Sequence, residues 1–161
     1  MPVICRPMLL GVKNNFLRVG LLAGILISML LPNCAFGSGL QKFGWDSRLI
    51  ILFSPSTLNN DFNSQKRHVY ESIDGVVERH IRIIKVVGRG PVTVDGLIDT
   101  TLNGPKLRSE FRILRKQFSI ILIGKDGDEK GRWVRPVSFK KLFDLIDEMP
   151  MRINEIYEQG G

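Results

Sequence analysis

Runs of apolar residues, separated by polar turn-forming stretches, divide the chain into expected strands and helices. Three runs are rich in branched side chains and short enough to be buried strands, and they cover residues 48–53, 81–87 and 118–123. An Asp-Gly pair after the third run favours a tight hairpin, so residues 132–134 are expected to return as a fourth strand. Residues 92–94 have weaker strand character.

Apolar residues at spacings of three and four predict helices between and after these strands. The first helix is expected to begin at Asn59 or Asn60, where a side-chain cap is available, and to stop at Gly75. Pro105 suits the first position of the second helix. The apolar face of this second helix is expected to consist of Leu107, Phe111 and Leu114.

The third predicted helix starts after Ser138, and its apolar face consists of Phe139, Leu142, Phe143 and Ile146. Pro150 cannot continue this helix and its ring excludes Met149 from the α region, so residues 153–157 are expected to form a separate terminal turn. The resulting order, β, α, β, α, β, β, α, is typical of a thioredoxin-like α/β fold with a central mixed sheet, a C-terminal β-hairpin and flanking helices. The pattern alone also allows other α/β folds.

Two motifs near the C-terminus resemble a known family. Gly-Lys-Asp-Gly at residues 124–127, followed by Lys130, and Ile-Asp-Glu-Met-Pro-Met-Arg at residues 146–152 are similar to the signature of the family of unknown function numbered 4174. Its domain is also found in secreted animal proteins with sushi repeats. The resemblance covers about residues 49–155 and implies a thioredoxin-like, even peroxiredoxin-like, fold. His80 departs from the family pattern, which usually has aspartate there.

The first 37 residues have the order of a secretory signal peptide. Basic residues without any acid precede an apolar run over residues 19–31, and small residues follow at 35–37. This run of 13 residues is shorter than the ~18–20 that a membrane span needs. We therefore expect a signal peptide over residues 1–37, one domain over residues 38–161, and no stable membrane span after cleavage.

Two alternatives for the leader stay open. Met8 would give a more compact leader if translation started there. Lipid attachment at Cys34 is a weaker alternative, because Pro32 and Asn33 are not the small pair that such processing prefers.

Removing the leader changes both the charge and the available chemistry. Of 23 basic residues, three lie in the leader, so 20 remain against 16 acidic residues and the net charge falls from +7 to +4. Nucleic acid is not an expected partner at this charge. Both cysteines, Cys5 and Cys34, lie in the leader, which leaves the exported domain without a thiol nucleophile, a disulfide or a Cys–metal site. We expect no cofactor and no metal, and a periplasmic or extracellular location.

The thioredoxin-like resemblance places the usual reactive cysteine after the first strand, where this chain has Ser54, Ser56 and Thr57. A serine without an adjacent base is a poor nucleophile, so turn and capping chemistry is expected. Binding of an anion by the backbone N–H groups of this segment is the functional alternative. At the hairpin tip, calcium is not expected, because the ligand spacing of an EF-hand is missing and Lys125 and Lys130 would compete with a cation.

Charged residues around the Met-Pro-Met segment allow two interpretations. In the structural one, Arg152 pairs with a carboxylate and pins the terminal turn to the sheet, with the help of Glu78, Arg79, Asp147 and Pro150. In the functional one, these charges form part of a ligand surface. The predicted ligand-binding residues are Ser54, Ser56, Thr57, Lys125, Asp126, Arg152 and Glu155.

Together these patterns predict an exported, non-catalytic thioredoxin-like binding or scaffold module. Its expected partner is an unknown protein or an acidic ligand of the cell envelope. The alternative is a peroxiredoxin-like or other oxidoreductase-type enzyme with a degenerate, cysteine-free active site. A single concave pocket lined by Ser54, Lys125 and Arg152 would favour the binding interpretation.

Overall fold

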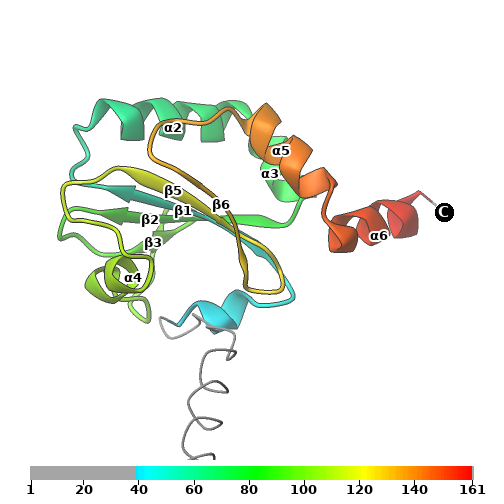
Figure 1. Ribbon diagram of the computed structural model, residues 1–161, viewed down its shortest axis with the longest axis horizontal. Helices are drawn as coiled ribbons and strands as arrows, with labels where there is room; N and C mark the ends of the chain where they lie inside the picture. The colour runs from blue at the N-terminus through cyan, green and yellow to red at the C-terminus, as the bar shows by residue number, and fades with distance from the viewer. Residues whose placement is uncertain (1–38, 161) are drawn as a thin grey trace, which may run out of the picture. The chain divides into compact units, whose positions relative to one another are not determined.

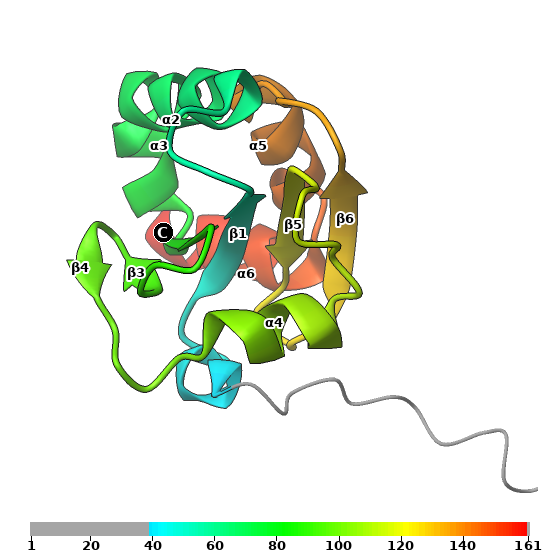
Figure 2. The ribbon, with the colours of Figure 1, turned by 90° about the vertical axis from the view of Figure 1, so that its left-hand side faces the viewer.

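The computed structural model of the protein describes residues 39–160, in which six strands form one mixed sheet between two layers of helices (Figures 1 and 2). The strand order is β4-β3-β2-β1-β5-β6. Central β1 runs parallel to β2 and antiparallel to β5. The strands are β1 (Arg48–Ser54), β2 (Ile81–Val87), β3 (Thr93–Val94), β4 (Leu97–Ile98), β5 (Ser119–Ile123) and β6 (Glu129–Trp133).

The helices divide between the two faces of the sheet, as both views show (Figures 1 and 2). Helices α2 (Asn60–Glu71), α3 (Ile73–Glu78) and α5 (Phe139–Asp147) cover one face. The short helix η2 (Leu40–Phe43) and α4 (Gly104–Glu110) cover the other. Helix α6 (Pro150–Gln159) packs at the end of the sheet where β1 begins.

All seven residues of β1 are buried, because both of its faces are covered. Ile50 and Leu52 face α2, α3 and α5, whereas Leu49, Ile51 and Phe53 face α4 and η2. This alternation produces two apolar cores, one on each face of the sheet.

The predicted fold class is confirmed. Several strands and helices also begin or end at the residues predicted for them. The run at residues 81–87 coincides with β2. Asn59 caps α2 by accepting a hydrogen bond from the Phe62 N–H at 2.9 Å. Met149 is extended, with φ −73° and ψ 136°, and Pro150 starts a new helix. That helix continues to Gln159, beyond the terminal turn that was expected.

Two predictions about helix ends are wrong. Gly75 does not stop a helix but lies inside α3, where a Cβ atom would come within 2.5 Å of the Phe143 ring. The chain needs glycine there for the close approach of α5. The apolar face of the second helix does not include Leu114, which is 75% exposed. Helix α4 ends at Glu110, and Arg112 has a positive φ of 56°, so Ile113 is buried instead.

The β3–β4 hairpin at the edge of the sheet was not predicted, although the sequence contains its signal. Asp95 and Gly96 both have positive φ, 49° and 92°, as a tight hairpin requires. The Asp95 carboxylate also accepts a hydrogen bond from the Ile83 N–H at 2.8 Å, which fixes the hairpin against β2. Asp-Gly occurs at residues 95–96 as well as at residues 126–127, but only the second pair had led to the prediction of a hairpin.

The leader lies outside the described residues, so its cleavage and the domain boundary at residue 38 remain expectations. Among residues 39–160, no helix combines the length and the apolar character that a bilayer span requires.

Candidate functional site

The corner where β1 meets α2 is closed by side-chain hydrogen bonds to backbone carbonyls. The Ser54 side chain is fully buried, and its hydroxyl donates a hydrogen bond to the Ser56 carbonyl at 2.7 Å. Ser56 and Thr57 are exposed, and the Thr57 carbonyl accepts from the Asn63 amide at 3.1 Å. Because the hydroxyl of Ser54 is bound to a carbonyl and not to a base, it has no activated nucleophile character.

Arg108 lies beneath this corner, a position that no local sequence pattern predicts. Its Nη2 donates to the Ser54 carbonyl at 2.6 Å and to the Val86 carbonyl at 2.9 Å, and its guanidinium lies 5.4 Å from the Phe53 ring centroid. Burial lowers the pKa of Arg108 from its usual value. This side chain therefore connects the ends of β1 and β2, which is a structural role.

A network of ion pairs gathers at the opposite end of β1. The ion-pair network consists of Arg48, Glu78, Arg79, Lys125, Asp147, Arg152 and Glu155. At its centre, the Glu155 carboxylate receives both arms of the Arg48 guanidinium, at 3.1 and 3.2 Å, and the Lys125 ammonium at 2.8 Å. The side chains of Arg48 and Lys125 are 1% and 8% exposed, so these charges are nearly removed from water.

The outer half of the network attaches α6 to α3 and α5. Arg152, 2% exposed, donates to Glu78 at 2.5 Å and to Asp147 at 3.2 Å. Arg79 binds Asp147 through both arms, at 2.9 and 2.7 Å, and its guanidinium carbon lies 4.3 Å from the Phe143 ring centroid. The residues named for the structural interpretation thus lie together, with Pro150 at the start of α6.

Glu155 and Asp147 stay ionised because the effect of their basic partners outweighs the effect of burial. Desolvation raises the pKa of Glu155, but hydrogen bonds and charge from Arg48 and Lys125 overcome it, and the net result is a lowered pKa. The pKa of Asp147 is lowered for the same reason, against its own desolvation, by Arg79 and Arg152. Both of these carboxylates are therefore held in their charged form by the basic side chains around them.

The structure separates the predicted ligand-binding residues into two groups. Ser54 ends β1. Lys125 and Arg152 instead pair with Glu155, which binds Arg48 at the start of the same strand, six residues or about 20 Å away. The three side chains therefore do not line one pocket. Lys125 and Asp126 line a small pocket of about 310 Å³ beside the Met-Pro-Met segment, and there Asp126 pairs with Lys130 at 2.6 Å.

Lys125 also contacts His80, whose role was not foreseen. The Lys125 ammonium lies 3.0 Å from Nδ1 of the exposed His80 side chain, and the backbone of His80 has a positive φ of 49°. A hydrogen-bond acceptor at this position suits the Lys125 ammonium, and the aspartate that is usual in the resembled family would also supply one.

A different and larger depression follows β2 beneath α2 and α3. This α2–β2 groove has a volume of about 900 Å³, within the range of ligand sites in proteins. Three apolar side chains on its rim are exposed: Tyr70 by 76%, Ile73 by 50% and Val77 by 67%. Its other lining residues include Lys66, Val69, His80, Ile81, Arg82, Ile83, Lys85 and Asp95.

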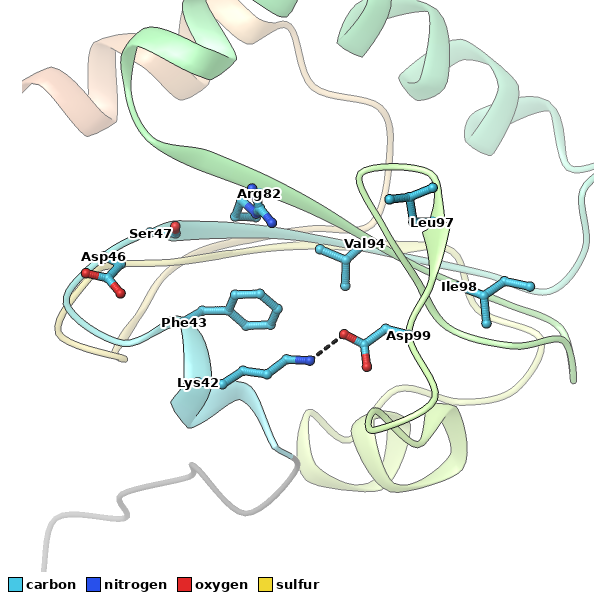
Figure 3. A pocket seen from close by; sticks show the side chains of 9 residues that line it. All are labelled: Lys42, Phe43, Asp46, Ser47, Arg82, Val94, Leu97, Ile98 and Asp99. Atoms are coloured by element: carbon cyan, nitrogen blue, oxygen red, sulfur yellow. Dashed lines mark hydrogen bonds and ion pairs between the residues drawn. The ribbon is translucent and has the colours of Figure 1, made fainter.

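A neighbouring pocket of about 470 Å³ lies between η2 and the β3–β4 hairpin, and Arg82 lines both it and the groove (Figure 3). Its two basic side chains are already paired, Lys42 with Asp99 and Arg82 with Asp95. Hydrogen bonds from Lys42 and Thr101 lower the pKa of Asp99 to about 2. Within the described residues, no group of three or more His, Cys, Asp or Glu side chains is placed to hold a metal ion.

The fold and these motifs agree with comparisons to known proteins. The sequence matches the family described as "Domain of unknown function (DUF4174)" over residues 39–155, and the chain belongs to this family. It is 27% identical to human sushi repeat-containing protein SRPX2 over 161 residues, 98% of this chain and 30% of the relative. It is 32% identical to rat sushi repeat-containing protein SRPX over 125 residues, 75% of this chain and 27% of the relative. The chain thus spans less than a third of these relatives.

Two solved structures show the same fold at low identity. A Plasmodium yoelii thioredoxin peroxidase I has a TM-score of 0.53 and 17% identity, over 73% of this chain and 80% of the other. A reduced 2-Cys peroxiredoxin from Plasmodium vivax has a TM-score of 0.50 and 13% identity, over 74% and 84%. These likenesses establish a thioredoxin-like fold.

Proposed function

We propose that this chain is an exported, non-catalytic thioredoxin-like binding module that holds its ligand in the α2–β2 groove. The observation that carries the proposal is the groove itself, in which exposed apolar side chains surround a volume of about 900 Å³. Isolated exposed apolar residues are normal, but a cluster around a depression is typical of a binding site.

The β1–α2 corner supports the non-catalytic part of this proposal. Ser54 occupies the region where the fold resemblance places a thiol, and its hydroxyl is committed to a backbone carbonyl. The only cysteines of the sequence, Cys5 and Cys34, precede the matched family region. The alternative function is a peroxiredoxin-like enzyme with a degenerate active site. Only the similarity in fold to the solved peroxiredoxins suggests this alternative.

Binding of the neutral apolar dye Nile red to the exported protein tests the groove. We expect its fluorescence to rise with the wild type and to fall at least fivefold in a Tyr70→Ser/Val77→Ser double variant, which replaces two mostly exposed side chains. Leu114→Ser is the matched control, because Leu114 is equally exposed but does not line the groove. Equal dye binding by all three proteins would refute the groove as the site.

A peroxide-consumption assay tests the absence of thiol chemistry. The exported protein, supplied with thioredoxin and its reductase, should consume no more peroxide than the buffer, because no sulfur nucleophile remains after cleavage. Robust thioredoxin-dependent turnover of peroxide would refute the non-catalytic binding module and support the enzyme.

The leader pattern supports export. Mass spectrometry of the exported product should find a mature chain that starts near Ser38. A product that retains Met1 or Met8, or that carries lipid on Cys34, would contradict this part of the proposal.

A further inference from the structure

We infer that the α2–β2 groove receives a peptide segment that is apolar along its length and acidic at one end. This inference rests on the proposed function, because it assigns a partner to the same groove. It follows from the charges that line the groove, from the position of those charges along the groove, and from the exposure of the rim.

The basic residues of the groove are unequally paired. Arg82 is neutralised by Asp95 at 2.9 Å. Lys66 and Lys85 also line the groove, and no carboxylate within residues 39–160 forms an ion pair with either of them. Two unpaired ammonium groups beside an apolar surface favour a ligand with negative charge.

These lysines lie toward one end of the groove. Lys85 is near the carboxyl end of β2, and Lys66 precedes Tyr70 on α2, which runs back from the carboxyl end of β1. The opposite end is lined by Asp46 and Ser47, just before β1. Negative charge on the ligand is therefore favourable at the Lys66 and Lys85 end and unfavourable beside Asp46.

The exposed rim indicates a peptide rather than a small amphiphile. A single hydrocarbon chain lying on Ile81 and Ile83 would leave Tyr70 and Val77 exposed to water. A peptide has side chains on two sides and can cover both the floor and the rim. The floor from Ile81 to Lys85 is about 13 Å long, which suits an extended segment of about five residues.

The edge of β2 is also partly open. Strand β3 pairs only with Ile84 and Lys85, and the hydrogen bonds from the Asp95 turn reach no further than Ile83. An extended segment can therefore approach the first part of β2 without displacing a strand.

Fluorescence anisotropy with rhodamine-labelled peptides tests this partner, using the exported protein. The probes are a four-leucine peptide with two glutamates at one end and versions with two glutamines or two lysines instead. We expect the glutamate peptide to bind at least tenfold more tightly than the others. A Lys66→Glu/Lys85→Glu variant should lose that preference and bind the lysine peptide.

The matched control is Lys106→Glu/Lys116→Glu, which changes the net charge equally at exposed lysines that do not line the groove. It should keep the wild-type preference. Equal affinity for all three peptides, or no peptide binding while Nile red still binds, would overturn the acidic partner and leave the binding module standing. Loss of groove-dependent binding to dye and peptides alike would overturn both.

The last experiment measures competition by vesicles that contain phosphatidylglycerol. We expect them not to compete with the glutamate peptide. Competition that disappears in the Lys66→Glu/Lys85→Glu variant would assign the groove to an anionic membrane surface and refute a peptide partner.

Discussion

The ion-pair network and the α2–β2 groove both contain clustered basic side chains, but they differ in how these charges are satisfied. In the network, Arg48 and Arg152 are almost fully buried and each contacts at least one carboxylate. In the groove, Lys66 and Lys85 lie beside exposed apolar residues without an acidic partner in the described chain. The same residue types are therefore paired with carboxylates in one region and left without an acidic partner among the described residues in the other.

Under the proposed function, pairing rather than the number of charges distinguishes a stabilising region from a binding region. A buried cation whose carboxylate is lost keeps its desolvation penalty, so such a network resists rearrangement by a ligand. An exposed lysine has no such constraint and can pair with a partner at little cost. Substitutions in the ion-pair network should therefore change the stability of the fold, and substitutions in the groove should change ligand binding.

Replacement of Arg48 should have the largest effect. Arg48→Ala removes both hydrogen bonds to Glu155 and the one to the Arg79 carbonyl at 2.9 Å. We expect a loss of about 3 to 5 kcal/mol in the free energy of unfolding, measured by urea denaturation, because Glu155 is left with less compensation. Lys140→Ala, at an exposed pair with Asp144, should change it by less than about 0.5 kcal/mol. Equal effects of the two variants would remove the contrast between network and surface.

Much of the fold could be predicted because local patterns and tertiary packing agree. The apolar runs of β1, β2 and β5 are buried on both faces, so hydrophobicity alone revealed them. Predictions failed where tertiary contacts decide the structure. Gly75 resembles a helix stop, but the ring of Phe143, 68 residues later, determines its role.

The candidate site was harder to predict than the fold. The motif around Arg152 pointed to charge pairing, and its possible partners were all named. Arg48 and Arg108 were not identified, because a strand residue and a helix residue carry no local sign of burial. The groove was missed for a related reason: its rim and floor come from α2, α3 and β2, and only the packed chain brings them together.

Replacement of Arg152 should have the second largest effect on stability. Its partners Glu78 and Asp147 are 55% and 35% exposed, so water compensates part of the loss. We expect Arg152→Ala to cost about 2 kcal/mol in thermal or urea unfolding. Arg152→Lys should recover only part of this, because an ammonium cannot bind two acids with the geometry of a guanidinium. Unchanged stability in Arg152→Ala would instead favour a ligand-binding role for this residue.

Gly75 connects the two regions, because α3 carries the groove residue Val77 and also packs against Phe143. Alanine would favour the helix by about 1 kcal/mol, but its Cβ would lie 2.5 and 2.7 Å from two ring atoms of Phe143, and such overpacking costs about 1 to 3 kcal/mol. We expect Gly75→Ala to be destabilising by about 1 kcal/mol in urea denaturation. The same substitution in a Phe143→Leu background should be neutral or stabilising, and a stabilising Gly75→Ala in the wild type would contradict the close approach.

Acidification should weaken the network more gradually than either arginine substitution. The pKa values of Glu155 and Asp147 are lowered in the folded protein, so the unfolded chain binds more protons at moderately acidic pH. Their contribution to stability is therefore complete above the unfolded pKa values of about 4 and is lost as pH falls through the lower folded values. Urea denaturation from pH 6 to pH 3 should show a falling free energy of unfolding. A Glu155→Gln variant should start from a lower stability and fall less steeply, since glutamine cannot take up the proton. A wild type whose stability is constant or rises over this range would show that the carboxylates of the network do not stabilise the fold through their charge.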